Sequence, residues 1–251
     1  MKDQTKSAKE VGVLFDVDGT LVDSTYFHTM AWWQAFRQQG LDVPMASIHR
    51  HIGMGGDKLL ERLLPANCDR DIRDTVERAH SAIFSTFWPA IRPFESASTL
   101  LQACAESGLA VALASSAHES DLRVLRRILD AEPWIDCATS SADATEGKPS
   151  PDILLAALER LHLKAADVAF VGDSVWDVKA AARLGIETIG LTCGGISAGE
   201  LFEAGAVEVY SGPRALLQRL DASSIGKLAR RNDDAEPGGT APGAPADNAS
   251  R

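Results

Sequence analysis

Cysteine and positive charge are both scarce in this chain of 251 residues. Its 4 cysteines never stand in a Cys-x-x-Cys spacing, so we expect neither a disulfide framework nor a zinc site, but reduced and mostly packed thiols. Its 25 basic residues face 35 acidic ones, and the resulting net charge of −10 argues against a surface for nucleic acid or for an anionic membrane.

Long apolar runs are also absent. The longest, over residues 108–114, falls far short of the roughly 20 residues that a membrane helix needs. Residues 1–10 are polar and lack the apolar core of a secretion signal. We therefore expect a soluble, cytoplasmic protein. The sequence shows no internal repeat and says nothing about oligomeric state.

Short apolar runs instead alternate with helix-favouring stretches. Strands are expected at 11–15, 109–114, 135–138, 168–171, 187–191 and 206–209, and helices between them at 119–129, 152–161 and 175–184. This alternation predicts an α/β fold with a Rossmann-like, doubly wound parallel sheet and helices on both faces. In such sheets, ligands bind at the carboxyl ends of the strands.

Two segments depart from that rhythm. Residues 24–92 contain helical patterns at 26–39, 57–64 and 70–87, which predict an all-helical cap inserted between core segments 10–23 and 93–230. Residues 231–251 are rich in Pro, Gly, Ala and acidic residues, a composition that buries too little apolar surface to order itself. We expect that segment to be a disordered tail.

The first expected strand runs directly into a pair of carboxylates. Asp16 and Asp18 are followed by Gly19, which permits a tight turn, and by the hydroxyl of Thr20. Carboxylates crowded at a strand end are costly unless a cation or a reaction uses them. Their oxygens suit a hard cation such as Mg²⁺ and, through it, a phosphate.

Three later stretches place further polar residues at strand or helix ends. Ser115 and Ser116 follow one expected strand, Lys148 precedes a helix, and Asp173 and Asp177 follow another strand. Two of these residues also fit a structural reading. Ser116 has capping-box spacing to residue 119, and Asp177 has it to residue 174. A purely structural role for Ser116 therefore stays open, and we expect Asp177 to support the metal or Lys148.

These four stretches, in this order, resemble the four motifs of the haloacid dehalogenase (HAD) superfamily, whose members are mostly phosphatases with an aspartate nucleophile. The resemblance implies that Asp16 is the nucleophile and Asp18 the acid and base. It also implies Mg²⁺ held by Asp16, by Asp173 and by the backbone carbonyl of Asp18. Lys148 supplies a fixed charge, and Ser115 binds phosphoryl oxygens, with Thr20 and Ser116 as further candidates. A neighbouring carboxylate is expected to raise the pKa of Asp18.

In the cap, we expect His28 and the loop glycines Gly53, Gly55 and Gly56 to face the substrate. Three glycines in four residues allow a close backbone approach, and helical-cap members of the similar family carry their specificity there. The cap tryptophans, Trp32 and Trp33, stand at helical spacing and are expected mostly in the core of the cap.

The leading hypothesis is a Mg²⁺-dependent phosphatase of a small phosphorylated metabolite, similar to the phosphoglycolate-phosphatase-like members. An isomerase like β-phosphoglucomutase is the alternative: the spacing of His28 fits it, but Gly56 stands where those mutases carry an arginine. A HAD-like binding module without catalysis is a further alternative. Asp18 argues against dehalogenation, because dehalogenases generally lack this second aspartate.

Overall fold

A computed structural model describes residues 9–235 of the chain. Its centre is a six-stranded sheet in the order β3-β2-β1-β4-β5-β6, and every neighbouring pair is parallel. The strands are β1 (Gly12–Phe15), β2 (Ala110–Ala114), β3 (Cys137–Thr139), β4 (Val168–Gly172), β5 (Glu187–Leu191) and β6 (Glu208–Tyr210). The order reverses beside β1, which confirms the predicted doubly wound sheet.

Side chains of the central strand alternate between two apolar layers, as the period of a strand requires. Val13 and Phe15 of β1 belong to one buried cluster, which Leu100 of α5 joins. Leu14 belongs to the opposite cluster, with Ile153 of α7. The helices of this part of the fold are α5 (Ala97–Glu106), α6 (Glu119–Leu129), α7 (Asp152–Leu161), α8 (Val175–Ala182), α9 (Ala198–Ala204), α10 (Pro213–Leu217) and α11 (Ser224–Ala235).

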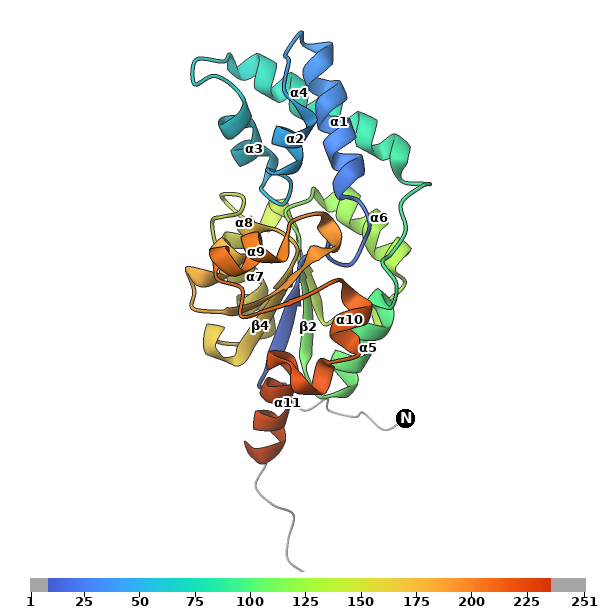
Figure 1. Cartoon of the computed structure of the whole chain (residues 1–251), viewed down its shortest axis with the longest axis vertical. Helices are drawn as coiled ribbons and strands as arrows, with labels where there is room; N and C mark the ends of the chain where they lie inside the picture. Colours follow the sequence, from blue (N-terminus) through green and yellow to red (C-terminus); the bar gives the residue numbers. More distant parts are fainter. Residues whose placement is uncertain (1–8, 236–251) are drawn as a thin grey trace, which may run out of the picture.

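The inserted segment is helical, as predicted. It consists of α1 (Thr25–Gln38), α2 (Met45–His49), α3 (Gly56–Leu63) and α4 (Arg70–Phe87), which stand above the strand ends in Figure 1. These helices enclose an apolar cluster of their own that includes Trp32, Phe36 and Val76, and Trp33 packs against it. The cap tryptophans therefore lie where the helical spacing placed them.

The register of the sheet determines where the motifs meet. Phe15 lies beside Leu113 on one side and beside Val171 on the other. Because the strands are parallel, the residues that follow β1, β2 and β4 emerge together at one edge. That edge faces the cap (Figure 1).

The expected tail needs one correction. Helix α11 continues to Ala235, so residues 231–235 are helical, while the rest of that prediction lies outside the described residues. Boundaries of the other expected elements differ by at most two residues, and several agree at both ends. All four cysteines are free thiols, of which Cys104 is buried. Within residues 9–235, no helix is both long and apolar enough to cross a membrane.

Candidate active site

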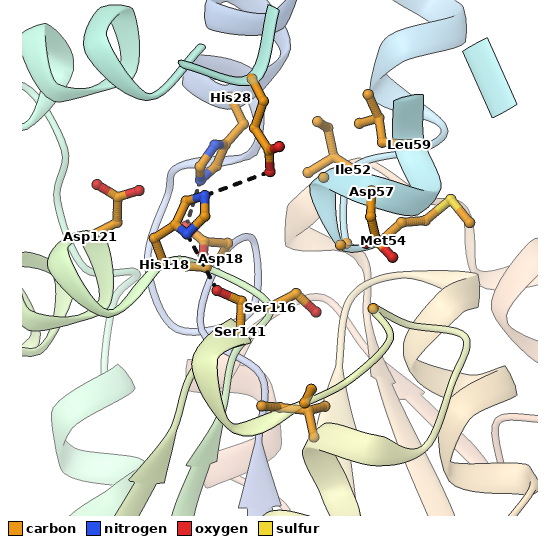
Figure 2. A pocket seen from close by; sticks show the side chains of 18 of the residues that line it. Asp18, His28, Ile52, Met54, Asp57, Leu59, Ser116, His118, Asp121 and Ser141 are labelled. Atoms are coloured by element: carbon orange, nitrogen blue, oxygen red, sulfur yellow. Dashed lines mark hydrogen bonds and ion pairs between the residues drawn. The ribbon is translucent and has the colours of Figure 1, made fainter. Parts of the chain in front are cut away.

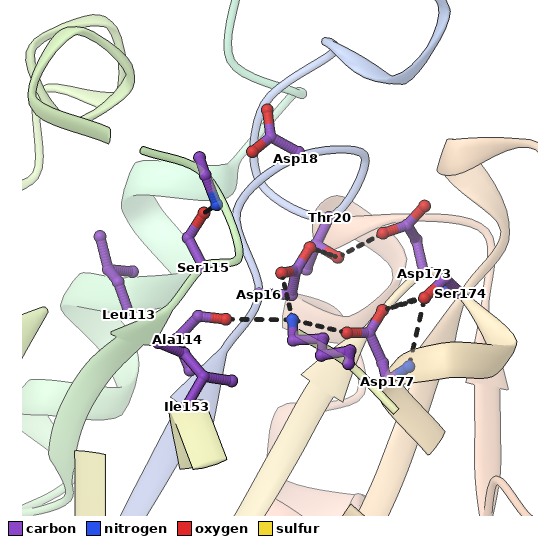
Figure 3. A network of polar contacts seen from close by, with 12 residues as sticks. Asp16, Asp18, Thr20, Leu113, Ala114, Ser115, Ile153, Asp173, Ser174 and Asp177 are labelled. Atoms are coloured by element: carbon purple, nitrogen blue, oxygen red, sulfur yellow. Dashed lines mark hydrogen bonds and ion pairs between the residues drawn. The ribbon is translucent and has the colours of Figure 1, made fainter. Parts of the chain in front are cut away.

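A buried lysine, Lys148, joins the carboxylates of Asp16 and Asp177, which Figure 3 labels, beyond the end of β1. Lys148 Nζ lies 2.6 Å from Asp16 Oδ1 and 2.7 Å from Asp177 Oδ1, and it donates to the Ala114 carbonyl at 3.1 Å. Burial works to lower the pKa of Lys148, but the two carboxylates outweigh it and hold the pKa above its usual value. The lysine therefore stays charged.

The carboxylates of Asp16, Asp173 and Asp177 form one buried group, with one oxygen from each lying within 4.8 Å of the others. The Thr20 hydroxyl donates to Asp173 Oδ1 at 2.9 Å and lies 3.3 Å from Asp16 Oδ2. Burial raises the pKa of Asp16 to about 7 against the opposing effect of Lys148. Burial, with Asp177 and Asp16 beside it, also raises the pKa of Asp173 well above its usual value.

This donor set fits a divalent cation. Three buried carboxylates face a single lysine, so neutralising all of them takes two further positive charges. Carboxylate oxygens are also the ligands that Mg²⁺ prefers.

The Asp177 Oδ2 atom accepts from the Ser174 backbone N–H at 3.0 Å, so the predicted capping box is confirmed. Asp177 therefore has two roles: it caps the first turn of α8, and it pairs with Lys148.

Sequence reasoning missed the glycine that makes room for this group. A Cβ atom on Gly194 would lie 1.7 Å from Asp173 Oδ2, so only glycine leaves space there for the carboxylate. Gly194 follows β5, and nothing in its sequence neighbourhood marks it as part of a site.

The Asp18 carboxylate lies apart from this group, against the cap. Its Oδ1 atom accepts from Ser24 Oγ at 2.5 Å and lies 3.1 Å from His28 Nε2. Burial alone would raise the pKa of Asp18, but His28 and Ser24 together hold it below its usual value. The predicted rise in this pKa is therefore wrong: the groups that face Asp18 are a histidine and a hydroxyl, which stabilise the carboxylate, and not another acid.

His28 is itself held by cap residues. Its Nδ1 atom lies 3.1 Å from His80 Nε2, and its ring stacks on Phe84 at a centroid distance of 3.7 Å. Burial lowers the pKa of His80 well below its usual value, so His80 contacts His28 as a neutral ring. The sequence offered one usable signal for His80: it stands one helical turn before Phe84, on the buried face of α4.

The two serines after β2 have different surroundings. Ser115 is buried, and its hydroxyl accepts from the Ala117 N–H at 3.1 Å. Ser116 lines the cavity, and its hydroxyl has no hydrogen-bond partner within residues 9–235. Helix α6 begins at Glu119 with His118 as N-cap, so the capping box considered for Ser116 is wrong.

A cavity of about 320 Å³ lies between the cap and the strand ends (Figure 2). Asp16, Asp18 and Ser116 line it from the core. His28 and the predicted glycines line it from the cap: Gly53, Gly55 and Gly56. Thr20, Ser115, Lys148 and Asp173 are buried and stand behind this lining.

Polar contacts hold the cap against the core around this cavity. Trp176 Nε1 donates to the Arg50 carbonyl at 3.0 Å. A ring nitrogen of His49 lies 3.0 Å from the Gly194 carbonyl, and Lys58 Nζ lies 3.2 Å from a Glu146 carboxylate oxygen. The cavity is therefore enclosed by residues from both parts of the chain.

Known proteins resemble this chain in sequence. The family model of haloacid dehalogenase-like hydrolases matches residues 11–185. Phosphoglycolate phosphatase of Yersinia pestis is 32% identical over 188 residues, which cover 73% of this chain and 81% of the relative. Phosphoglycolate phosphatase of Escherichia coli (strain K12) is 29% identical over 208 residues, with the same two shares.

Solved structures resemble the chain as well. A hydrolase from Pseudomonas syringae has a TM-score of 0.80 at 30% identity and covers 85% of this chain and 98% of its own. A putative β-phosphoglucomutase from Bacteroides vulgatus has a TM-score of 0.77 at 19% identity, covering 89% and 92%, and shares the fold. With the family model spanning most of the chain, this enzyme belongs to the haloacid dehalogenase-like hydrolase family.

Proposed function

We propose that this hydrolase is a Mg²⁺-dependent phosphatase that cleaves phosphate monoesters of small metabolites through an aspartyl-phosphate. One observation carries the proposal. Asp16 lies at a cavity with a charged lysine behind it and Asp173 and Asp177 beside it, while a separate carboxylate, Asp18, faces the same cavity. The names of the relatives from Y. pestis and E. coli agree with phosphatase chemistry.

Asp16 and Asp173 would hold Mg²⁺, with the backbone carbonyl of Asp18 as the resemblance implies and with Asp177 beside them. When bound, the ion offsets the repulsion between a dianionic phosphate and the carboxylates. Lys148 favours the ionised form of Asp16 through its ion pair, against the effect of burial.

The residues then divide the chemistry. An Asp16 oxygen attacks phosphorus and forms the aspartyl-phosphate, while the ester oxygen leaves with a proton from the minor protonated form of Asp18, whose pKa is held low. Asp18 next takes a proton from water, and the resulting hydroxide attacks the aspartyl-phosphate and releases inorganic phosphate. Ser115, Ser116 and Thr20 remain our candidates for positioning the phosphoryl group, and Ser116 is the one with a free hydroxyl at the cavity.

A phosphosugar isomerase is less well supported. Such an enzyme binds a substrate with a second phosphate, which needs a cation to hold it. Gly56 stands where those mutases carry an arginine. Among the described residues that line the cavity, none is a lysine or an arginine. The cavity, of about 320 Å³ and lined by both cap and core, suits a single small ester.

The test is release of phosphate from p-nitrophenyl phosphate with Mg²⁺, comparing wild type with Asp16→Asn. We expect release from the wild type alone, and equal release by both proteins would contradict the proposal. The control is Asp42→Asn, because Asp42 is a surface residue of the cap whose side chain is 81% exposed. Rapid quenching and mass spectrometry should find phosphate on Asp16 during turnover.

A further inference from the structure

The cavity contains more acid than the proposed chemistry uses. Besides Asp16 and Asp18, four carboxylates line it: Asp57, Glu77, Asp121 and Glu146. Among the described residues that line it, none is a lysine or an arginine. A cavity with this charge repels an anionic leaving group and attracts a cationic one.

Three of the four acids have an ordinary explanation. Glu146 pairs with Lys58 at 3.2 Å, and Glu77 lies 3.7 Å from His118 Nε2, across the gap between cap and core. Asp57 lies on α3 and is exposed, so water solvates its charge. These three need no ligand.

Asp121 differs from them. It lies in α6 and lines the cavity opposite the cap (Figure 2), and only 4% of its surface is exposed. The structure gives its carboxylate no hydrogen bond and no ion pair within residues 9–235. Burial raises its pKa, with Asp18 contributing and with His28 and His118 opposing from a distance. A carboxylate that is buried without a partner is costly.

A helix-capping role does not account for Asp121. It is the third residue of α6, the position from which an acid reaches back to the N-cap backbone. In this same chain Asp143, Asp177 and Glu200 occupy that position in their helices and make the bond. Asp121 occupies it without making the bond and turns to the cavity instead.

We propose that Asp121 binds a protonated amine on the leaving group of the substrate, so that the preferred substrates are amine-bearing phosphate monoesters. The inference rests on the proposed phosphatase function and specifies its substrate class. Asp18 and Asp121 line one cavity, so an ester whose oxygen takes a proton from Asp18 can direct its ammonium group to Asp121. Trp32, Ile52 and Leu59 add apolar wall to the same cavity. Phosphoglycolate, which carries a carboxylate in place of the amine, is disfavoured.

Three two-carbon esters test this: phosphoethanolamine, 2-hydroxyethyl phosphate and phosphoglycolate, which present an ammonium, a hydroxyl and a carboxylate. For the wild type we expect kcat/KM to fall in that order, with the amine ester about tenfold to a hundredfold above the hydroxyl ester, as a charged hydrogen bond contributes. Asp121→Asn should remove most of that ratio while leaving hydrolysis of the hydroxyl ester within about twofold.

Two controls keep the result interpretable. Asp57→Asn removes the same charge from an exposed position on the same cavity and should preserve the amine-to-hydroxyl ratio. A thermal unfolding scan should show Asp121→Asn to be at least as stable as the wild type, because the substitution removes an unpaired buried charge.

Other results overturn the inference. Wild-type preference for phosphoglycolate would do so, as would an equal loss on all three esters in Asp121→Asn, or loss of the ratio in Asp57→Asn. Cleavage of p-nitrophenyl phosphate without an amine preference removes this inference and leaves the phosphatase proposal standing. Absence of any Asp16-dependent release from all four esters removes both.

Discussion

The Nε2 atom of His28 lies 3.1 Å from Oδ1 of Asp18, so a side chain from the first cap helix holds the carboxylate that we propose as acid and base. The other ring nitrogen of His28 faces His80, and the ring stacks on Phe84. Because all three belong to the cap, the position of Asp18 depends on how the cap is seated. The cap therefore contributes to the chemistry as well as to selectivity.

Replacing His28 tests this dependence. His28→Asn should lower kcat about tenfold or more on an alkyl phosphate, because a mispositioned Asp18 protonates the leaving oxygen poorly. The loss should be much smaller on p-nitrophenyl phosphate, whose leaving group needs little protonation. His162→Asn is the matched control, since His162 is exposed at the end of α7 and lies outside the cavity lining, and it should leave both rates unchanged. Equal losses on the two esters would argue that His28 acts only structurally.

Metal binding should be visible without any substrate. Mg²⁺ should raise the thermal unfolding temperature of the wild type, because binding to the folded state alone stabilises it, by about 2.7 kcal/mol at a hundredfold excess over Kd. Asp173→Asn should abolish this rise. The same substitution should stabilise the metal-free protein, since it removes one of three like charges buried together. Asp42→Asn should behave as the wild type in both respects, and an undiminished Mg²⁺ effect in Asp173→Asn would contradict the assigned ligands.

Sequence patterns predicted the features that depend on a strand and its neighbours in the sheet, namely the strand positions and the residues at the strand ends. Apolar runs located the sheet, and parallel strands bring their ends to one edge, so Asp16 and Asp173 were expected near each other and are. The surroundings of Asp18 and Asp121 were not predictable in this way. Those of Asp121 depend on how α4 and α6 face each other across the cavity, which is a matter of packing between separate segments. The pKa of Asp18 was misjudged because α1 turns His28 back onto the loop after β1, a contact that no sequence spacing announced.

Substitutions of the two serines after β2 should have different effects, one on phosphate binding and the other on stability. Ser116→Ala should weaken inhibition by inorganic phosphate several-fold, because the Ser116 hydroxyl lies buried beside the cavity without a partner and can turn to a phosphate oxygen, and it should leave stability nearly unchanged. Ser115→Ala should cost about 1 kcal/mol of unfolding free energy, because it removes the acceptor of the Ala117 N–H. Inhibition constants and denaturant unfolding measure the two effects. Weaker phosphate inhibition in Ser115→Ala alone would instead make Ser115 the phosphate ligand.

Gly55 of the cap lies against the core backbone at Gly147, beside the cavity. A Cβ atom there would lie 2.7 Å from the Gly147 Cα atom, while its backbone, with φ of −63°, accommodates any residue. Gly55→Ala therefore acts by pushing the cap away from the core and not by straining its own loop. We expect kcat/KM to fall about tenfold to a hundredfold, as misplacement by about 1 Å causes elsewhere.

The control for that substitution is Gly199→Ala. Gly199 lies in α9, and the nearest atom to an added Cβ is Ser197 Oγ at 4.0 Å, so this change should leave kcat/KM unaltered and stabilise the helix slightly. If Gly55→Ala were as active as the wild type, the seating of the cap would not limit the reaction. If it lost activity together with a large fall in unfolding temperature, the loss would reflect folding, and the contact would then matter for stability rather than for closure over the substrate.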